Sequence, residues 1–331
     1  MAFTTGTSTD YKDLLNDLRD YIISVPAGSN WVVERDTSGG APDQVEMIFK
    51  GNGGGTDEIY FGVETYFDTG AGRYNWKLLG FTGFDTGVTF ENQPGVSPDT
   101  FVPLQNAAMS YWFYVTGRRV CVVVKTGSAY QFMHAGFIDP YSTAAEWPYP
   151  FLVMGSSSLS DTIYSSNQLH YASSVHPGGS SVSNSCSYMR DPTGFWMPII
   201  NFSGTTQESL LYNTANTAQV WPMCDHSGLD EYNSYEFRSY FCAISQGGTP
   251  AATLFRTVNS GGNPVVPLIN TCITTRNPSR QLYGEIHNLY WCPLSDTVAA
   301  EDTITDGATV YDVFGNIHRT DSWCGLAIKQ E

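Results

Sequence analysis

The spacing of apolar residues predicts one helix, over residues 9–23. The positions that recur at helical spacing, and so form one apolar face, are Tyr11, Leu14, Leu15, Leu18 and Ile22. Ser8 or Thr9 can cap the start of this helix, and Pro26 ends it. Asp10 and Asp13 lie in the first turn, where the helix dipole favours a carboxylate. We expect the helix to cover one face of a sheet; the alternative is a docking element for a partner protein.

Short runs of aromatic and β-branched residues predict strands in the rest of the chain. Runs of this kind lie at 31–35, 45–50, 58–67, 74–81, 195–202, 235–244, 253–258, 282–290 and 309–314. The glycine-rich segments 51–55 and 69–72 suit tight turns, because glycine adopts backbone conformations closed to other residues. A glycine-rich loop can also hold phosphate, but that requires a following helix with Lys and Ser or Thr. No helix pattern follows Gly55, so hairpin turns are predicted.

The clearest hairpin joins residues 111–115 to residues 119–125 through the turn at Gly117. Both arms are aromatic or β-branched, which favours antiparallel strands. A third run, 129–138, is expected to extend the same sheet. The segment 146–153 contains two prolines, and proline cannot donate to a central ladder, so an extended edge segment is predicted there.

A serine-rich stretch divides the sequence. We predict an α+β N-terminal domain over residues 1–155, a Ser/Gly-rich loop or linker over 156–190, and a β-rich C-terminal domain over 191–331. The expected fold class is therefore mainly β, with antiparallel sheets and an N-terminal helix. No fixed period indicates a repeat architecture.

The charge composition of the chain excludes some classes of binding partner. The 331 residues include 32 acidic and 16 basic side chains, a net charge of −16. Nucleic-acid backbones and anionic membranes attract clustered Lys and Arg, so neither is an expected partner. No secretory signal or apolar run long enough to span a membrane is evident, which predicts folding in a cytosol. The seven cysteines form no CxxC pair, and thiols in apolar surroundings such as Cys121 and Cys292 are expected to be buried and reduced.

Catalytic and metal motifs are weak. There is no G-x-S-x-G elbow, and the close pairs Cys224/His226 and His170/His176 lack the second half of a metal site. Paired carboxylates for sugar hydrolysis could come from Asp225, Asp230 and Glu231, near Trp221 and Tyr232. An Asp-Glu pair beside Tyr in a polar run is more often a solvated loop, so the loop is the favoured interpretation. No catalytic residue, cofactor or metal is assigned.

Three segments resemble virion structural proteins of tailed bacteriophages. They are the run 111–125 with the aromatic and proline-rich positions after it up to residue 151, the opening 6–14, and the ending 311–320. The resemblance does not extend to residues 156–285. It implies a non-enzymatic component of a phage tail, associated with the baseplate or with the tail tube or sheath. Such a protein is assembled in the host cytoplasm and works in the virion, in contact with other virion proteins and with copies of itself in a symmetric ring.

The resemblance implies contact surfaces instead of an active site. The predicted interface residues are Tyr11, Leu14, Gly117, Arg118, Arg119, Trp147 and Tyr149. Aromatic side chains and Arg are enriched among residues that dominate contact energies. One alternative is a receptor- or glycan-binding tail-tip protein using Trp221, Tyr232 and Tyr235. A polysaccharide depolymerase using Asp225 or Glu231 is the other.

Overall fold

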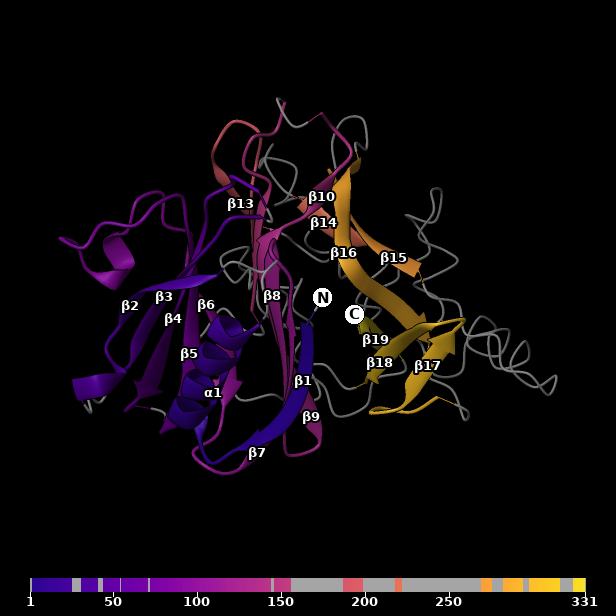
Figure 1. The fold of residues 1–331 in the computed structure, drawn as a ribbon, viewed down its shortest axis with the longest axis horizontal. Helices are drawn as coiled ribbons and strands as arrows, with labels where there is room; N and C mark the ends of the chain where they lie inside the picture. Colours follow the sequence, from indigo (N-terminus) through magenta and orange to yellow (C-terminus); the bar gives the residue numbers. More distant parts are fainter. Residues whose placement is uncertain are drawn as a thin grey trace.

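The computed structural model describes residues 2–25, 31–40, 44–53, 55–70, 72–143, 146–155, 187–198, 218–221, 269–275, 282–293, 298–315 and 324–330. These residues form three antiparallel sheets and one α-helix near the N-terminal end, so the predicted fold class is confirmed. In Figure 1 one sheet stands in the middle, with a second sheet on its left and a third on its right.

We call the middle sheet the central sheet. Its strand order is β1 (Ala2–Ser8), β7 (Met109–Val115), β8 (Arg119–Thr126), β9 (Ala129–Phe137), β11 (Phe151–Met154), β12 (Ser187–Arg190) and β13 (Trp196–Pro198). The predicted hairpin is confirmed as β7 and β8, with Tyr111 opposite Val124. The edge position predicted for 146–153 is wrong, because β11 pairs with β9 on one side and with β12 on the other. The prolines end at Pro150, so Phe151–Met154 can donate hydrogen bonds to both neighbours.

The N-terminal sheet covers one face of the central sheet. It is a meander of β2 (Val32–Asp36), β3 (Glu46–Gly51), β4 (Ile59–Asp68), β5 (Arg73–Phe81) and β6 (Thr100–Leu104). The predicted glycine-rich hairpin turns are confirmed, since β3 pairs with β4 and β4 with β5. Gly53 and Gly72 have φ values of 65° and 68°, in the region that favours glycine. The far face of this sheet is covered by Phe90 in the short 3-10 helix η2 (Phe90–Asn92) and by its flanking loop.

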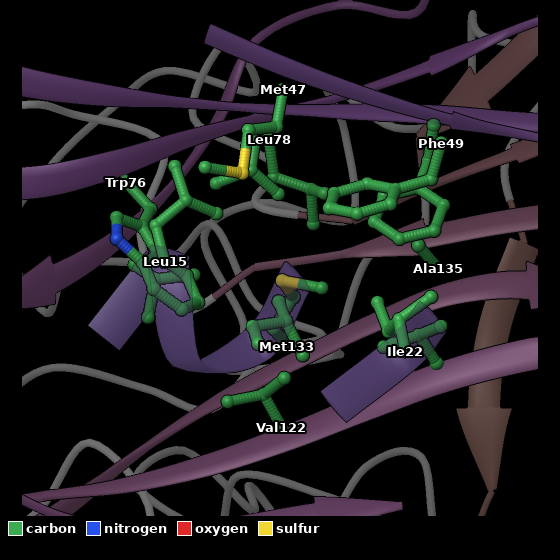
Figure 2. Packing of buried hydrophobic residues seen from close by; sticks show 14 of the residues in the cluster. Leu15, Ile22, Met47, Phe49, Trp76, Leu78, Val122, Met133 and Ala135 are labelled. Carbon is green, nitrogen blue, oxygen red and sulfur yellow. The ribbon is translucent and has the colours of Figure 1, made fainter. Parts of the chain in front are cut away.

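The helix α1 (Tyr11–Ser24) lies between the N-terminal and central sheets. Its five predicted apolar positions are all buried. Figure 2 shows Leu15 and Ile22 in one cluster with Met47 of the N-terminal sheet and Met133 of the central sheet. The helix cap is Asp10, whose carboxylate accepts from the backbone N–H of residues 12 and 13 at 2.7 and 2.8 Å. The predicted caps Ser8 and Thr9 instead donate their hydroxyls to the Asp13 carboxylate, so that part of the prediction is wrong.

The C-terminal sheet covers the other face of the central sheet. Its order is β14 (Ala218–Trp221), β15 (Ile269–Thr275), β16 (Leu282–Pro293), β19 (Cys324–Gln330), β18 (Thr309–Phe314) and β17 (Thr303–Asp306), and β10 (Asp139–Pro140) also pairs with β16. The pair β12–β13 spans the predicted domain boundary at residue 190, so residues 187–198 complete the central sheet. The predicted linker 156–190 falls mostly outside the described residues, as do the predicted strands 235–244 and 253–258.

Candidate interaction site

Several of the predicted contact residues lie inside the chain. Tyr11 and Leu14 belong to the buried face of α1, and Arg119 and Trp147 are also buried. The indole N–H of Trp147 donates to the Arg190 carbonyl at 2.9 Å. These four side chains stabilise the chain's own core and offer no accessible surface. Their assignment as contact residues is therefore corrected: the aromatic or apolar character of Tyr11, Leu14 and Trp147 marked the core, and the charged Arg119 is buried as well.

The remaining predicted residues lie around the β7–β8 turn. Arg118, next to Gly117 in this turn, places its guanidinium over the ring of Phe137, 5.9 Å from the centroid. Tyr149 packs against the same ring at 4.9 Å and donates its hydroxyl to the Phe81 carbonyl at 2.6 Å. The structure thus brings Arg118 and Tyr149 together through Phe137. The Arg118 side chain keeps 42% of its surface exposed.

Arg118 also joins a charged group where the central and C-terminal sheets meet. Its guanidinium lies 3.3 Å from one oxygen of Asp139, and the Nδ1 atom of His287 lies 2.6 Å from the other. Burial raises the pKa of Asp139, but the hydrogen bond from His287 and the nearby positive charges outweigh this effect and hold the pKa below its ordinary value. Asp139 on β10 and His287 on β16 both belong to the C-terminal sheet, whereas Arg118 lies in the β7–β8 turn of the central sheet. The ion pair between Arg118 and Asp139 therefore ties the two sheets together. Neither residue pair was foreseen from the sequence.

A second polar group is buried between these two sheets. Arg119 donates to the Cys121 sulfur at 3.3 Å, and Cys121 lies opposite His134 on β9. Burial, followed by the charge of Arg119, lowers the pKa of His134 to about 3. Neither ring nitrogen of His134 has a hydrogen-bond partner among the described residues. Burial raises the pKa of the Cys121 thiol, so this cysteine is a protonated, inert core residue.

Two further contacts cross the same interface. The Tyr114 hydroxyl donates to Asp312 at 2.6 Å, and Gln330 donates to the other carboxylate oxygen at 2.7 Å. Burial nevertheless raises the pKa of Asp312. At the rim, Lys125 and Tyr130 of the central sheet both donate to the carboxylate of Glu301. Polar contacts thus accompany the apolar ones at several places where the C-terminal sheet meets the central sheet.

The N-terminal sheet holds one carboxyl with a strongly shifted pKa. Glu64 is buried on the outer face of β4, between Glu46 on β3 and Lys77 on β5 in the strand register. Burial raises its pKa to about 7, although the charge of Lys77 acts in the opposite direction. Shifted carboxyls occur at catalytic sites and in structural ion pairs alike. Here Lys77 forms its ion pairs with Glu91 and Asp99, which lie at the covering loop, so the group fastens that loop to the sheet.

Most edge strands of the described sheets carry features that discourage pairing with another chain. In the N-terminal sheet, β2 has the charged run 34–36 and a register shift after Val33, and β6 contains Pro103. In the central sheet, β13 has three residues and ends in Pro198. The edges of the C-terminal sheet, β14 and β17, have four residues each, and β17 ends in an aspartate.

The strand β1 lacks all of these features. Its seven residues, Ala2–Ser8, contain no charge and no proline, and they pair with β7 without a register shift from Ala2↔Val115 to Ser8↔Met109. Within the described part of the chain, no strand pairs with the other side of β1. Thr5 and Thr7 are exposed. This open edge is the candidate interaction site. The sequence reading missed it, although the uncharged, threonine-rich composition of residues 2–8 is typical of a strand.

The residues of the two alternative functions cannot be placed as sites. Trp221 ends β14, where only the backbone is described, and residues 224–235, including the three acidic candidates, lie outside the described residues. Among the residues that are described, no three His, Cys, Asp or Glu side chains form a possible metal site. The described helix is too short and too polar to cross a membrane.

Comparison with models of known protein families gave no match, and a comparison with curated proteins found no relative of this chain.

Proposed function

We propose that this chain is a non-enzymatic structural component of a bacteriophage tail, associated with the baseplate or with the tail tube or sheath, and present in many copies. The observation that carries the proposal is the open edge of β1 on a sheet buried on both faces. An unprotected strand edge is a template for another strand, and monomeric proteins usually block such edges.

Two further features support assembly. The resemblance of residues 6–14, 111–125 and 311–320 to tail proteins includes the β7 strand that holds β1 in place. A net charge of −16 keeps free copies apart in solution, so association requires a surface with little acidic charge. Contacts of modest affinity become strong when they repeat around a ring, because each one raises the effective concentration of the next.

The test is the protein content of purified particles. Virions are separated on a density gradient, and quantitative mass spectrometry compares this chain with the other particle proteins across the gradient fractions. We expect the chain to peak with infectious particles, at a constant ratio of several copies per particle. A chain that stays in the soluble fraction of the infected-cell lysate would contradict the proposal. Other soluble proteins of the same lysate provide the control for contamination.

A further inference from the structure

We infer that β1 of one copy pairs in antiparallel fashion with β1 of a second copy, so that two central sheets join into one continuous sheet. This inference rests on the proposed function, because it names the partner of the assembly site. The outer edge of β1 presents backbone N–H and C=O groups over seven residues. A strand of matched length satisfies these groups most fully. A second β1 has that length and generates a closed two-fold contact.

Charge selects β1 over the other edges for contact between identical copies. Antiparallel self-pairing of β2 would place Glu34 opposite Glu34, and β17 ends in Asp306 and is preceded by the acidic residues 301–302. Like charges placed directly opposite one another destabilise a strand pair. Two copies with a charge of −16 each can approach closely only where such charges are missing, and β1 has none.

The side chains of β1 are compatible with self-pairing. The register that covers the whole strand centres on Thr5, which then faces Thr5 of the second copy, and Thr–Thr pairs are favourable across strands. The same register places Phe3 opposite Thr7. The ring centroid of Phe3 lies 5.0 Å from that of Tyr114 in the same copy, so the ring is held in place and offers an apolar surface to the exposed Thr7 of the second copy. A Cβ atom at Gly6 would lie 2.5 Å from the hydroxyl oxygen of Tyr111, so glycine lets β1 lie close to β7.

The first experiment places like charges across the inferred two-fold axis. The full chain carrying Thr5→Lys and Thr7→Lys is compared with the unchanged chain by sedimentation equilibrium. The matched control carries Thr303→Lys and Thr305→Lys, which are exposed threonines at the same spacing on the edge strand β17. We expect the unchanged and control chains to dimerise at concentrations up to about 100 µM, and dimerisation of the β1 variant to weaken at least about tenfold. Thr5 donates to the Tyr111 carbonyl at 2.8 Å, so thermal melting verifies that the variant stays folded.

The second experiment separates self-pairing from binding of another partner. A chain with Thr5→Asp and Thr7→Asp is mixed with the lysine variant of β1. Opposite charges then face each other at position 5, so we expect a heterodimer although neither variant dimerises alone. No heterodimer, an unchanged chain that stays monomeric at about 100 µM, or a lysine variant that dimerises normally would overturn the inference. The proposed function would survive these results if the chain co-purifies with virions, and would fail independently if it does not.

Discussion

The two faces of the central sheet are built from alternating residues of the same strands, yet they differ in chemistry. On β8, Val120, Val122 and Val124 face the N-terminal sheet within a wholly apolar cluster. The alternate positions of β8 include Arg119 and Cys121, which face the C-terminal sheet together with His134 of β9. The first interface depends mainly on apolar burial, and its polar contacts are hydrogen bonds of neutral groups such as the Trp31 indole N–H, which donates to the Thr116 carbonyl at 2.6 Å. Stability at the second interface depends in addition on the ionisation of buried groups.

This difference indicates which interface makes the stability of the protein depend on pH. Apolar burial changes little between pH 4 and pH 8, whereas a buried group with a shifted pKa couples stability to pH. The C-terminal sheet is therefore held by the pH-sensitive interface and the N-terminal sheet by the insensitive one. Four substitutions test this contrast, from the largest expected effect to the smallest.

Phe113→Ala removes a fully buried ring from the apolar interface. We expect the free energy of unfolding to fall by about 3–5 kcal/mol, because the lost transfer energy adds to the cost of a cavity. Denaturant unfolding at pH 7 and pH 5 should give the same loss. A loss that differs by more than about 1 kcal/mol between these pH values would break the comparison.

His134→Leu removes the pH-sensitive imidazole from the other interface. The pKa of His134 in the folded chain, about 3, lies below its ordinary value of 6.5, so the unfolded chain takes up a proton below pH 6.5 while the folded chain does not. The unchanged chain should therefore lose about 3 kcal/mol of unfolding free energy between pH 7 and pH 4 through this group. The variant lacks this imidazole, so its free energy of unfolding should not show that part of the decrease. Equal acid sensitivity in both chains, measured by urea unfolding across this range, would refute the assignment.

Tyr114→Phe removes the hydroxyl that donates to Asp312 across the interface. The carboxylate keeps its bond from Gln330 but loses one buried partner, so we expect a loss of about 1–3 kcal/mol at pH 7. Asp312→Asn alone and combined with Tyr114→Phe completes a double-mutant cycle. A coupling energy near zero would show that the hydroxyl and the carboxylate do not stabilise each other.

Lys125→Ala removes the exposed donor to Glu301 at the rim of the same interface. The expected loss is below about 1 kcal/mol, because ion pairs between exposed side chains are screened by water and salt. Thermal melting at low and high salt provides the measurement. A large loss of stability that persists at high salt would contradict this expectation, because it would show that the rim ion pair stabilises the interface as much as the buried contacts do.

The sequence predicted the regular parts of the fold well. The helix, the strands β2 to β5 of the N-terminal sheet and the β7–β8 hairpin have strong periodic patterns, and the described residues confirm them. The strands β1, β6, β15, β17 and β19 were missed because they are short or because their alternation of apolar and polar residues is weak. Their pairing comes from strands distant in the sequence, which a local pattern does not record.

The site was less predictable than the fold. Local character does not distinguish a buried aromatic residue from an exposed one, so Trp147 and Tyr11 were assigned to contacts although they fill the core. Arg119 and His134 are polar and yet buried, because the C-terminal sheet covers them. The open edge of β1 follows from the strand order, which is a property of the assembled sheet.

The pairing of Ala2 with Val115 has a consequence for how the chain folds. During synthesis β1 has to wait until β7 leaves the ribosome, and the central sheet is complete only after Pro198. Closing such long loops carries an entropic cost before any pairing energy is gained, so folding should be slow. In that interval the uncharged β1 is open on both edges, and newly made chains held close together would meet first through this segment.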